Sequence, residues 1–264
     1  MEHRNISLRP ILLWAALCWL VLAGVVFFTP IAMTSVSDDS GWSSVAWLIS
    51  ESGGKYGTLA ILLVTCFFYT RFVPGVWRKW VTFGGVLLRL VLVIGAFAWV
   101  NEYAIKKIAS APRPSHVFFM KQSDGQLDLA SFYAMDAGQR TEVLKELIRV
   151  RPAQFDEINE RVLRHWVEET GFGFPSGHSF NAFLLAAILA YSLRYSRSKT
   201  ANRIYILPLV WATLVALSRV SMGAHTSWDV SFGALTGLIL GALILHFDLL
   251  RRNLLHRDHE ATSA

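Results

Sequence analysis

The sequence predicts an all-α polytopic membrane protein with six transmembrane helices and a small helical extramembrane insert between spans three and four. Of its 264 residues, 53% are hydrophobic, and the mean hydropathy is +0.41. Much of this apolar content lies in runs near the roughly 20 residues that a helix needs to cross a bilayer. A helix that buries only one face carries polar residues on its other face, whereas these runs are apolar almost throughout. They therefore predict membrane spans.

Six apolar segments follow one another along the chain. The first comes after a basic stretch with Arg4 and Arg9, and its length favours an uncleaved span over a signal peptide. A polar connection with a short interfacial helix near residues 46–49 follows it. The third span contains Arg89, which we expect to face protein or water rather than lipid. The expected spans are residues 11–33, 56–73, 81–105, 176–195, 204–222 and 228–250, all within one membrane-embedded domain covering residues 1–264.

Residues 106–172 form the insert, where charged residues are frequent and apolar residues recur at helical spacing. This spacing predicts two amphipathic helices, at about residues 140–150 and 153–170, which lie on or above the membrane surface. The pattern leaves two roles open for them. They form either a lid or lipid-docking surface, or a solvated cap without a specific role.

The net charge of +6 is not concentrated in a basic domain. The excess Lys and Arg residues lie beside the apolar runs, so we expect membrane lipids as surroundings and no nucleic-acid partner. Both cysteines, Cys18 and Cys66, lie inside apolar runs, which favours packing over a disulfide or a thiol metal site. Nothing in the sequence indicates an obligate protein partner.

Basic residues assign the two ends of the spans to the two sides of the membrane. The N-terminal tail, the 71–79 loop, the 194–203 loop and the start of the C-terminal tail are rich in Lys and Arg, which predicts that they are cytoplasmic. Six spans then bring four other span ends together on the opposite face: the end of span three, the start of span four, the end of span five and the start of span six.

Three cations and a helix start at those four ends suggest an anion site. Lys106, Arg113 and Arg219 supply positive charge, and the planar Arg side chain suits phosphate oxygens. Taken singly, they also fit ordinary interfacial residues that reach toward water. Ser176 can cap the start of span four, where Gly177 lets an anion approach the free amide groups. A helix cap without a ligand is the alternative.

Two histidines and a carboxylate add a reactive group to this anion site. His225 and Asp229 are four residues apart, so on a helix the carboxylate can orient the imidazole and leave its other nitrogen free to attack. A structural His–Asp pair is one alternative. A metal site is another, which the nearby cations disfavour. His178, with an ordinary pKa of about 6.5, can protonate a leaving alcohol. The set predicts two-step phosphomonoester cleavage through a phosphohistidine, without metal or cofactor.

These motifs resemble the three-part signature of the type 2 phosphatidic acid phosphatase superfamily, which also includes vanadium haloperoxidases. The matching pattern is Lys106-x6-Arg113-Pro114, then Pro175-Ser176-Gly177-His178, then Ser218-Arg219-x5-His225-x3-Asp229. The resemblance implies that His225 is the nucleophile, Asp229 its partner and His178 the acid and base. It also implies a set of phosphate-binding residues, namely Lys106, Arg113, Ser176, Gly177 and Arg219.

The spans and the insert further resemble the bacterial inner-membrane members of that superfamily. This likeness implies hydrolysis of phosphatidylglycerophosphate to phosphatidylglycerol at the periplasmic face, with both termini in the cytoplasm. Undecaprenyl pyrophosphate, phosphatidate, lysophosphatidate and diacylglycerol pyrophosphate are further expected substrates. A preference for undecaprenyl pyrophosphate and phosphate transfer to an acceptor other than water stay open. An anion or lipid transporter, the rival from another class, predicts charges near the bilayer midplane rather than at one end.

The remaining histidines have no partner at a useful spacing, so we expect them at the surface or at the membrane interface. They are His3, His116, His165, His246, His256 and His259.

Overall fold

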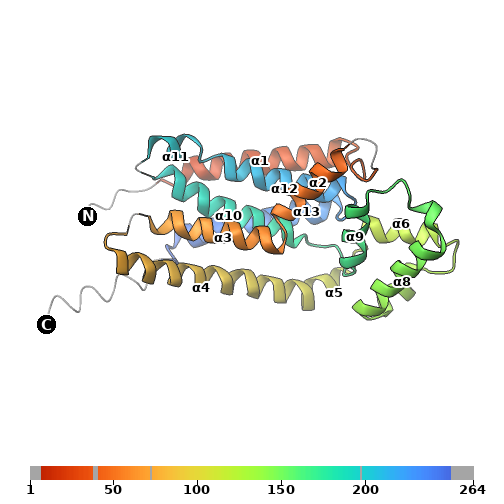
Figure 1. Cartoon of the computed structure of the whole chain (residues 1–264). Coiled ribbons are helices and arrows are strands. Elements are labelled where there is room, and N and C mark those ends of the chain that lie inside the picture. Colours follow the sequence, from red (N-terminus) through yellow and green to blue (C-terminus); the bar gives the residue numbers. More distant parts are fainter. Residues whose placement is uncertain (1–6, 38–40, 72, 197, 251–264) are drawn as a thin grey trace.

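The computed structural model describes residues 7–37, 41–71, 73–196 and 198–250, and over these residues its regular elements are all helices. This confirms the predicted all-α class for the described part of the chain. Long helices run side by side in an elongated bundle, and a group of shorter helices gathers at one end of it (Figure 1). An isolated bridge between Ser37 and Ile158 is the only β-type pairing within the described residues.

Three helical segments are long and apolar enough to cross a membrane: Arg9–Phe28, Val76–Ala109 and Ser227–His246. The first is α1 and the last is α13. The second combines α4 (Val76–Val100), the π-helical turn η2 (Asn101–Ile105) and α5 (Lys106–Ala109). Two shorter apolar helices accompany them, α3 (Lys55–Thr70) and α12 (Leu207–Ser221). The structure thus places a helix in each of these predicted apolar segments.

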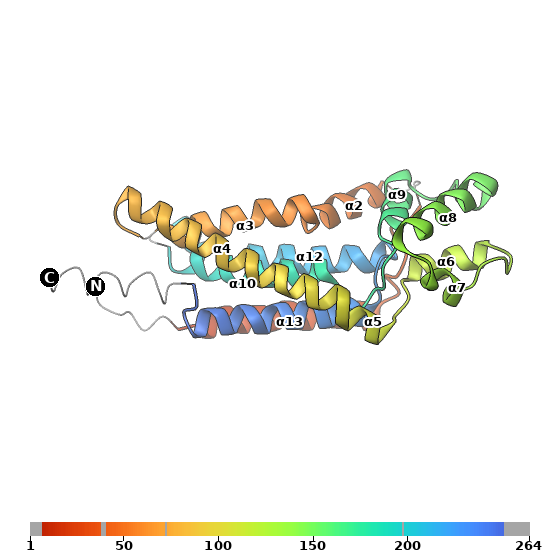
Figure 2. The same ribbon diagram turned by 90° about the horizontal axis from the view of Figure 1, so that it is seen from below.

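The central helix of the bundle is α10 (Gly177–Arg194), which packs against α3, α12 and α13 (Figure 2). Its residues from Phe180 to Leu193 are mostly buried, as expected for a helix that is hydrophobic on every side. Glycines allow α13 to approach it closely. A Cβ atom at Gly237 would lie 2.4 Å from the carbonyl oxygen of Phe180. Contact this close fixes the position of α13 relative to the start of α10.

The helices of residues 114–168 lie beyond the end of the bundle (Figure 1). They surround an apolar core that includes Phe119, Phe132, Leu144 and Trp166. The elements are α6 (Pro114–Gln122), α7 (Leu129–Ala134), α8 (Ala137–Val150), the 3₁₀ turn η3 (Pro152–Gln154) and α9 (Glu160–Glu168). The sequence analysis did not predict α6 or α7, which are short.

The two predicted amphipathic helices correspond to α8 and α9. Helix α8 begins before residue 140 because Asp136 and Gln139 form a capping box at its start. The predicted start of the second helix at residue 153 is wrong. Residues 152–154 form a 3₁₀ turn, and the helix begins only after Asn159, whose side chain accepts a hydrogen bond from the backbone of Arg161. The short interfacial helix is also longer than predicted and forms α2 (Trp42–Ser52).

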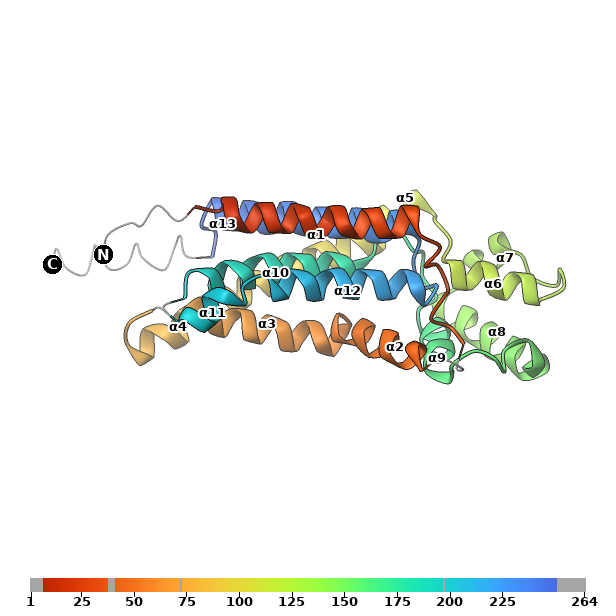
Figure 3. The same cartoon turned by 90° about the horizontal axis from the view of Figure 1, so that it is seen from above.

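The basic segments and the segment ends that carry the predicted site residues lie at opposite ends of the bundle. The start of α1, the connection between α3 and α4, and α11 (Lys199–Arg203) lie at one end (Figure 3). The end of α4, the start of α10, the end of α12 and the start of α13 lie at the other end, beside the shorter helices. The four segment ends that carry the predicted site residues therefore share one side of the molecule.

The close approach of α10 and α13 gives a stability prediction. Gly237→Ala places a methyl group against the backbone of Phe180, so the helices must separate or shift. We expect destabilisation of about 1–3 kcal/mol, as for other overpacked sites. The measurement is the thermal unfolding midpoint of the purified protein in detergent. Gly84→Ala is the matched control, because a Cβ atom there meets nothing within 4 Å. Equal midpoints for the two variants would contradict this account of the packing.

Candidate functional site

A cavity of about 390 Å³ opens where the four segment ends meet. Its walls come from α3, α4, η2, α10 and the segments that precede α10 and α13. Both apolar and charged side chains line it. The residues that line it include Thr58, Ile94, Phe97, Ala98, Asn101, Glu102, Lys106, Arg113, Glu169, Gly177, His178, Asn181 and His225.

His225 and Asp229 form the predicted pair. Nδ1 of His225 lies 3.3 Å from Oδ2 of Asp229, and both side chains are buried. The same carboxylate oxygen accepts a 2.8 Å hydrogen bond from the backbone N–H of Thr226, because Thr226 and Asp229 form a capping box that starts α13. The carboxylate is therefore held in place and fixes the imidazole. Nε2 of His225 remains on the cavity side, 3.2 Å from Nη1 of Arg113.

The Arg113 guanidinium connects three parts of the site. Its Nε donates to the carbonyl oxygen of Gly171 at 2.8 Å, and its Nη1 donates to the carbonyl oxygen of Ala224 at 3.0 Å. Nη1 also lies 2.6 Å from Oε2 of Glu169. The first two bonds hold the segments before α10 and α13 beside the Arg113 loop. The same side chain thus shapes the cavity and presents charge to it.

Glu169 bridges two of the predicted cations. Its Oε2 lies 2.5 Å from Nη2 of Arg219 and 2.6 Å from Nη1 of Arg113, and its side chain is 24% exposed. Arg219 is completely buried and does not line the cavity, so the carboxylate lies between it and the open space. A carboxylate that accepts from two guanidiniums has the charge and bonding geometry of a bound oxyanion. Glu169 therefore occupies an anion position built by Arg113 and Arg219.

Two further side chains hold Arg219 in place. Its Nη1 donates to Oγ of Ser50 at 2.8 Å and lies 2.5 Å from Nε2 of His165. On the side of the His165 ring that faces away from Arg219, Nδ1 lies 3.6 Å from Oε1 of Glu51. Helix α2, which precedes all three motifs, and helix α9, which lies between the first and the second, thus supply the surroundings of a motif residue on α12.

The sequence analysis missed Glu169, His165, Glu51 and Ser50. His165 lies on α9, and Glu169 follows the last residue of that helix, so the interval of four residues leaves the two side chains close together, with Nε2 of His165 3.5 Å from Oε1 of Glu169. They also precede the Pro-Ser-Gly-His turn by only a few residues, which is a signal that the sequence contained. The contribution of α2 had no such signal, because it depends on how α2 packs against α9 and α12.

The π-helical turn brings another cation to the cavity. Residues 101–105 continue α4 with a wider turn, and Asn101, Glu102 and Lys106 all line the cavity. Nζ of Lys106 lies 2.7 Å from Oε2 of Glu102, and the Lys106 side chain is 13% exposed. π-Helical turns are frequent at functional sites because the extra residue redirects side chains. Here the turn places an ion pair at the cavity wall.

The start of α10 contributes His178 and Gly177 to the cavity. Oγ of the buried Ser176 accepts from the backbone N–H of Ser179 at 3.4 Å, which confirms its predicted position as the N-cap. The Ser176 side chain does not line the cavity. A Cβ atom at Gly177 would meet nothing within 4 Å, so the helix start is open at that position. Nδ1 of His178 lies 4.0 Å from Oε1 of Glu169.

Electrostatics keep the imidazole neutral and the carboxylate charged. Burial and the Arg113 guanidinium lower the pKa of His225 to about 3, so the ring is unprotonated at neutral pH. Burial raises the pKa of Glu169, but Arg219 and Arg113 outweigh it and hold that pKa well below its ordinary value. Burial and Arg219 lower the pKa of His165 to about 4. A neutral imidazole beside a fixed positive region can act as a nucleophile.

The expectation for the remaining histidines is wrong for two of them. His165 is buried against Arg219, and His116 is buried on α6 with its Nδ1 2.7 Å from Oη of Tyr133. The same hydroxyl lies 3.3 Å from the backbone nitrogen of Arg113, so His116 contacts the site indirectly. His246 is exposed, as expected. His3, His256 and His259 lie outside the described residues. Cys18 and Cys66 are buried and unbridged, in agreement with packing roles.

A helical bundle that gathers cations, a neutral imidazole and an apolar wall around one cavity has the properties of a membrane enzyme acting on an anionic group. Comparison with known families agrees with this class. The family model described as PAP2 superfamily matches residues 85–252, which include every predicted site residue. The chain therefore belongs to the PAP2 superfamily. It is a phosphatase, a phosphoric monoester hydrolase.

Similar proteins carry the same name in several bacteria. The chain is 27% identical over 207 residues to phosphatidylglycerophosphatase B of Haemophilus influenzae, covering 76% of this chain and 80% of the relative. It is 31% identical over 223 residues to phosphatidylglycerophosphatase B of Escherichia coli K12, covering 75% and 81%. A shorter match, 37% over 107 residues, links it to phosphatidylglycerophosphatase B of Bacillus subtilis, covering 35% and 53%.

The position of Glu169 gives a prediction about anion binding. Glu169→Gln removes the counter-charge of two guanidiniums, and breaking such a pair costs about 3–5 kcal/mol when it is fully buried. Because Glu169 is partly exposed, we expect a smaller loss, seen as a lower thermal unfolding midpoint without added anion. Added inorganic phosphate should then raise the midpoint more than in the wild type, since a ligand that binds only the folded state stabilises it.

Glu168→Gln is the control for this measurement. It removes the same charge from the neighbouring residue, whose side chain is exposed. We expect its midpoint and its response to phosphate to match those of the wild type. An equal phosphate response in all three proteins would show that Glu169 does not occupy an anion position.

Proposed function

We propose that this phosphatase hydrolyses phosphatidylglycerophosphate to phosphatidylglycerol and inorganic phosphate. The observation that carries the proposal is the composition of the cavity. The cavity is lined by apolar residues of α4, namely Ile94, Phe97 and Ala98, and by the polar side chains of Arg113 and His225. Such a cavity suits a ligand that is apolar at one end and an oxyanion at the other. The similar proteins are named phosphatidylglycerophosphatase B, which supports the same choice of substrate.

The first step is attack by Nε2 of His225 on phosphorus. Asp229 accepts a hydrogen bond from Nδ1–H of His225, which leaves Nε2 unprotonated, and its lone pair attacks once Nε2 leaves its contact with Nη1 of Arg113. A phosphorus–nitrogen bond forms while the bond from phosphorus to the lipid oxygen breaks. We propose that His178, which lines the same cavity, takes up a proton as the negatively charged phosphoryl group binds and then donates it to the departing oxygen. The products of this step are the lipid alcohol and a phosphohistidine at residue 225.

The second step is hydrolysis of the phosphohistidine. A water molecule attacks phosphorus, its proton passes to His178, and the phosphorus–nitrogen bond breaks. This step returns His225 to its neutral form and releases inorganic phosphate. Arg113, Lys106 and the amide groups at the start of α10 stabilise charge on the phosphoryl oxygens in both steps. The two steps need no metal ion or cofactor.

Arg219 joins this set only when the substrate phosphate takes the place of Glu169. In the free protein, Glu169 lies between Arg219 and the cavity. A phosphomonoester carries up to two negative charges near neutral pH, so its interaction with both guanidiniums is stronger than that of a carboxylate. We infer that Glu169 moves away from the two guanidiniums as the phosphoryl group binds. Ser176 contributes indirectly, by capping the helix that presents Gly177 and His178.

We propose that α1, α3, α4, α10, α12 and α13 form six membrane spans. The length and apolar composition of α1, α4 and α13 support this, as does the apolar character of α3 and α12. With the bundle in a bacterial inner membrane, the basic segments at the end opposite the catalytic cavity would lie on the cytoplasmic side. The catalytic cavity and the helices of residues 106–172 would then face the periplasm, where this insert forms one wall of the site through Arg113 and Glu169.

The proposed nucleophile can be tested directly. His225→Ala is expected to release no phosphate above background, a loss of at least about a thousandfold, because the covalent step needs the imidazole nitrogen of His225 that Asp229 orients. When turnover of a substrate with a labelled phosphate is quenched, the wild-type enzyme should hold a labelled, acid-labile phosphoryl group. The variant should lack this group. His246→Ala is the control, since His246 is exposed on α13, and it should keep the wild-type rate. Normal turnover by His225→Ala would exclude this mechanism.

A panel of purified lipid phosphates tests the choice of substrate. We expect the highest kcat/KM for phosphatidylglycerophosphate, followed by phosphatidate, lysophosphatidate, diacylglycerol pyrophosphate and undecaprenyl pyrophosphate. Rates in excess chelator should match those without it. A higher kcat/KM for undecaprenyl pyrophosphate would favour the diphosphatase alternative. Transfer of label to an added alcohol would favour a phosphotransferase, and lipid or anion transport without phosphate release would favour a transporter.

A further inference from the structure

A second hollow, of about 710 Å³, lies between α3 and α4 at the end of the bundle opposite the catalytic cavity. Its walls are apolar and largely exposed, and they include Leu63, Val64 and Phe67 of α3 and Trp80 of α4. From Leu63 to Thr70, the last residue of α3, the helix rises about 10 Å. The hollow is therefore a groove that runs along the two helices toward the middle of the bundle.

Two cations line this groove at the end where the helices are joined. Arg71 follows the last residue of α3, and Lys79 lies in the first turns of α4. Both side chains are exposed. Among the described residues, the ion pairs of the structure involve neither of them, and no acidic residue lines the groove. Within the part of the chain that the structure describes, the groove thus has an apolar length and a positive end that no acidic side chain neutralises.

Aromatic pairs stiffen the two walls. Phe67 and Phe68 meet edge to face with ring centroids 5.5 Å apart on α3, and Trp80 and Phe83 meet at 6.0 Å on α4. Trp side chains favour the level of lipid headgroups in a membrane because their rings are apolar and their N–H group is polar. The groove therefore combines fixed apolar walls, a headgroup-level Trp and two cations.

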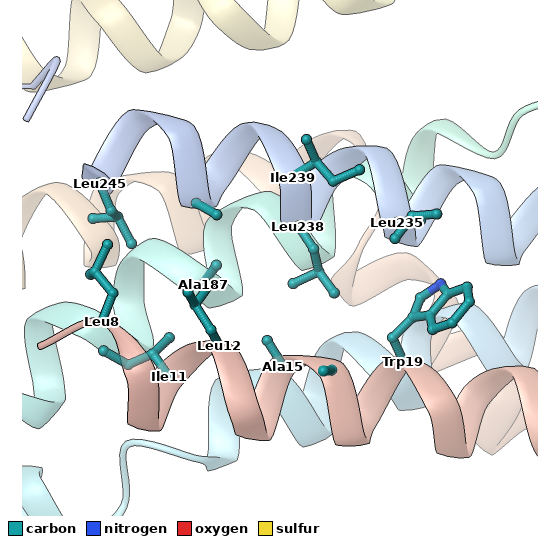
Figure 4. Close-up of a pocket in the computed structure, with 12 residues that line it drawn as sticks. Leu8, Ile11, Leu12, Ala15, Trp19, Ala187, Leu235, Leu238, Ile239 and Leu245 are labelled. Carbon is teal, nitrogen blue, oxygen red and sulfur yellow. The ribbon is translucent and has the colours of Figure 1, made fainter. Parts of the chain in front are cut away.

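Comparison with another apolar pocket shows which features are particular to this groove. Between α1 and α13, a pocket of about 210 Å³ is lined by Ala, Leu and Ile residues and Trp19 (Figure 4). No charged residue lines it, so it has nothing to distinguish one headgroup from another. The groove between α3 and α4 also precedes residue 85, where the match to the PAP2 superfamily begins.

We propose that the groove between α3 and α4 binds an anionic phospholipid, with an acyl chain along its apolar walls and the phosphate beside Arg71 and Lys79. In the proposed orientation this lipid belongs to the cytoplasmic leaflet, away from the catalytic cavity. Positive residues near a membrane surface attract anionic lipids by about 1 kcal/mol each. Two such residues predict that an anionic lipid binds about thirtyfold more tightly than a zwitterionic lipid with the same acyl chains.

Native mass spectrometry of the purified full-length protein in detergent tests this site. The probes are dioleoyl phosphatidylglycerol and dioleoyl phosphatidylcholine. We expect the wild type to bind the first about thirtyfold more tightly, and Arg71→Gln/Lys79→Gln to lose that preference. The double variant should hydrolyse lipid phosphates at the wild-type rate, which shows that it is folded and that the catalytic site is intact. Wild-type affinity for phosphatidylglycerol in this variant would overturn the proposal.

Lys199→Gln/Arg203→Gln is the matched control. It removes two positive charges from the same end of the molecule, at α11, where these residues line a polar pocket without an apolar groove. We expect it to keep the lipid preference, and an equal loss in both double variants would show general surface attraction instead. Val64→Trp fills the groove without changing its charge and should weaken binding of both lipids. If it leaves phosphatidylglycerol binding unchanged, the groove is not the site, even if the charge variant fails to fold.

Discussion

The buried charge of Arg219 is the constraint on which the rest of the site depends. A guanidinium with no exposed surface, at the end of an apolar helix, is stable only when counter-charges and acceptors surround it. Glu169, His165 and Ser50 meet this requirement from α9 and α2. Because these two helices come from distant parts of the sequence, satisfying one cation also assembles the wall of the cavity.

Backbone hydrogen bonds then hold the loops of the site in register. The N–H of Ser176 donates to the carbonyl oxygen of Asp229 at 2.9 Å, and the N–H of Gly173 donates to that of Ala111 at 2.9 Å. The N–H of Ser115 donates to the carbonyl oxygen of Gly223, also at 2.9 Å. Such bonds do not depend on side-chain identity. Together they tie the segments before α6, α10 and α13 to one another and fix the positions from which Arg113, His178 and His225 extend.

The sequence predicted the helical class and the group of motif residues because both depend on local spacing. Apolar runs identified the long helices, and the four-residue interval between His225 and Asp229 identified a pair that the structure brings into contact. Local spacing could not show that Glu169 would lie between Arg113 and Arg219, since that contact joins three separate elements. For the same reason His165 was expected at the surface, whereas its burial follows from the packing of α9 against α2.

The carboxylate of Glu169 has a consequence for an enzyme surrounded by phosphate esters. Bulk phospholipids are diesters with a single negative charge on phosphorus, and they far outnumber any monoester in a bilayer. Replacing a carboxylate that two guanidiniums already hold brings a singly charged diester little gain, whereas a doubly charged terminal phosphate gains more. Under the proposed displacement of Glu169, this internal carboxylate therefore discriminates between ligands by their charge and favours terminal phosphates over the bulk phospholipids of the bilayer.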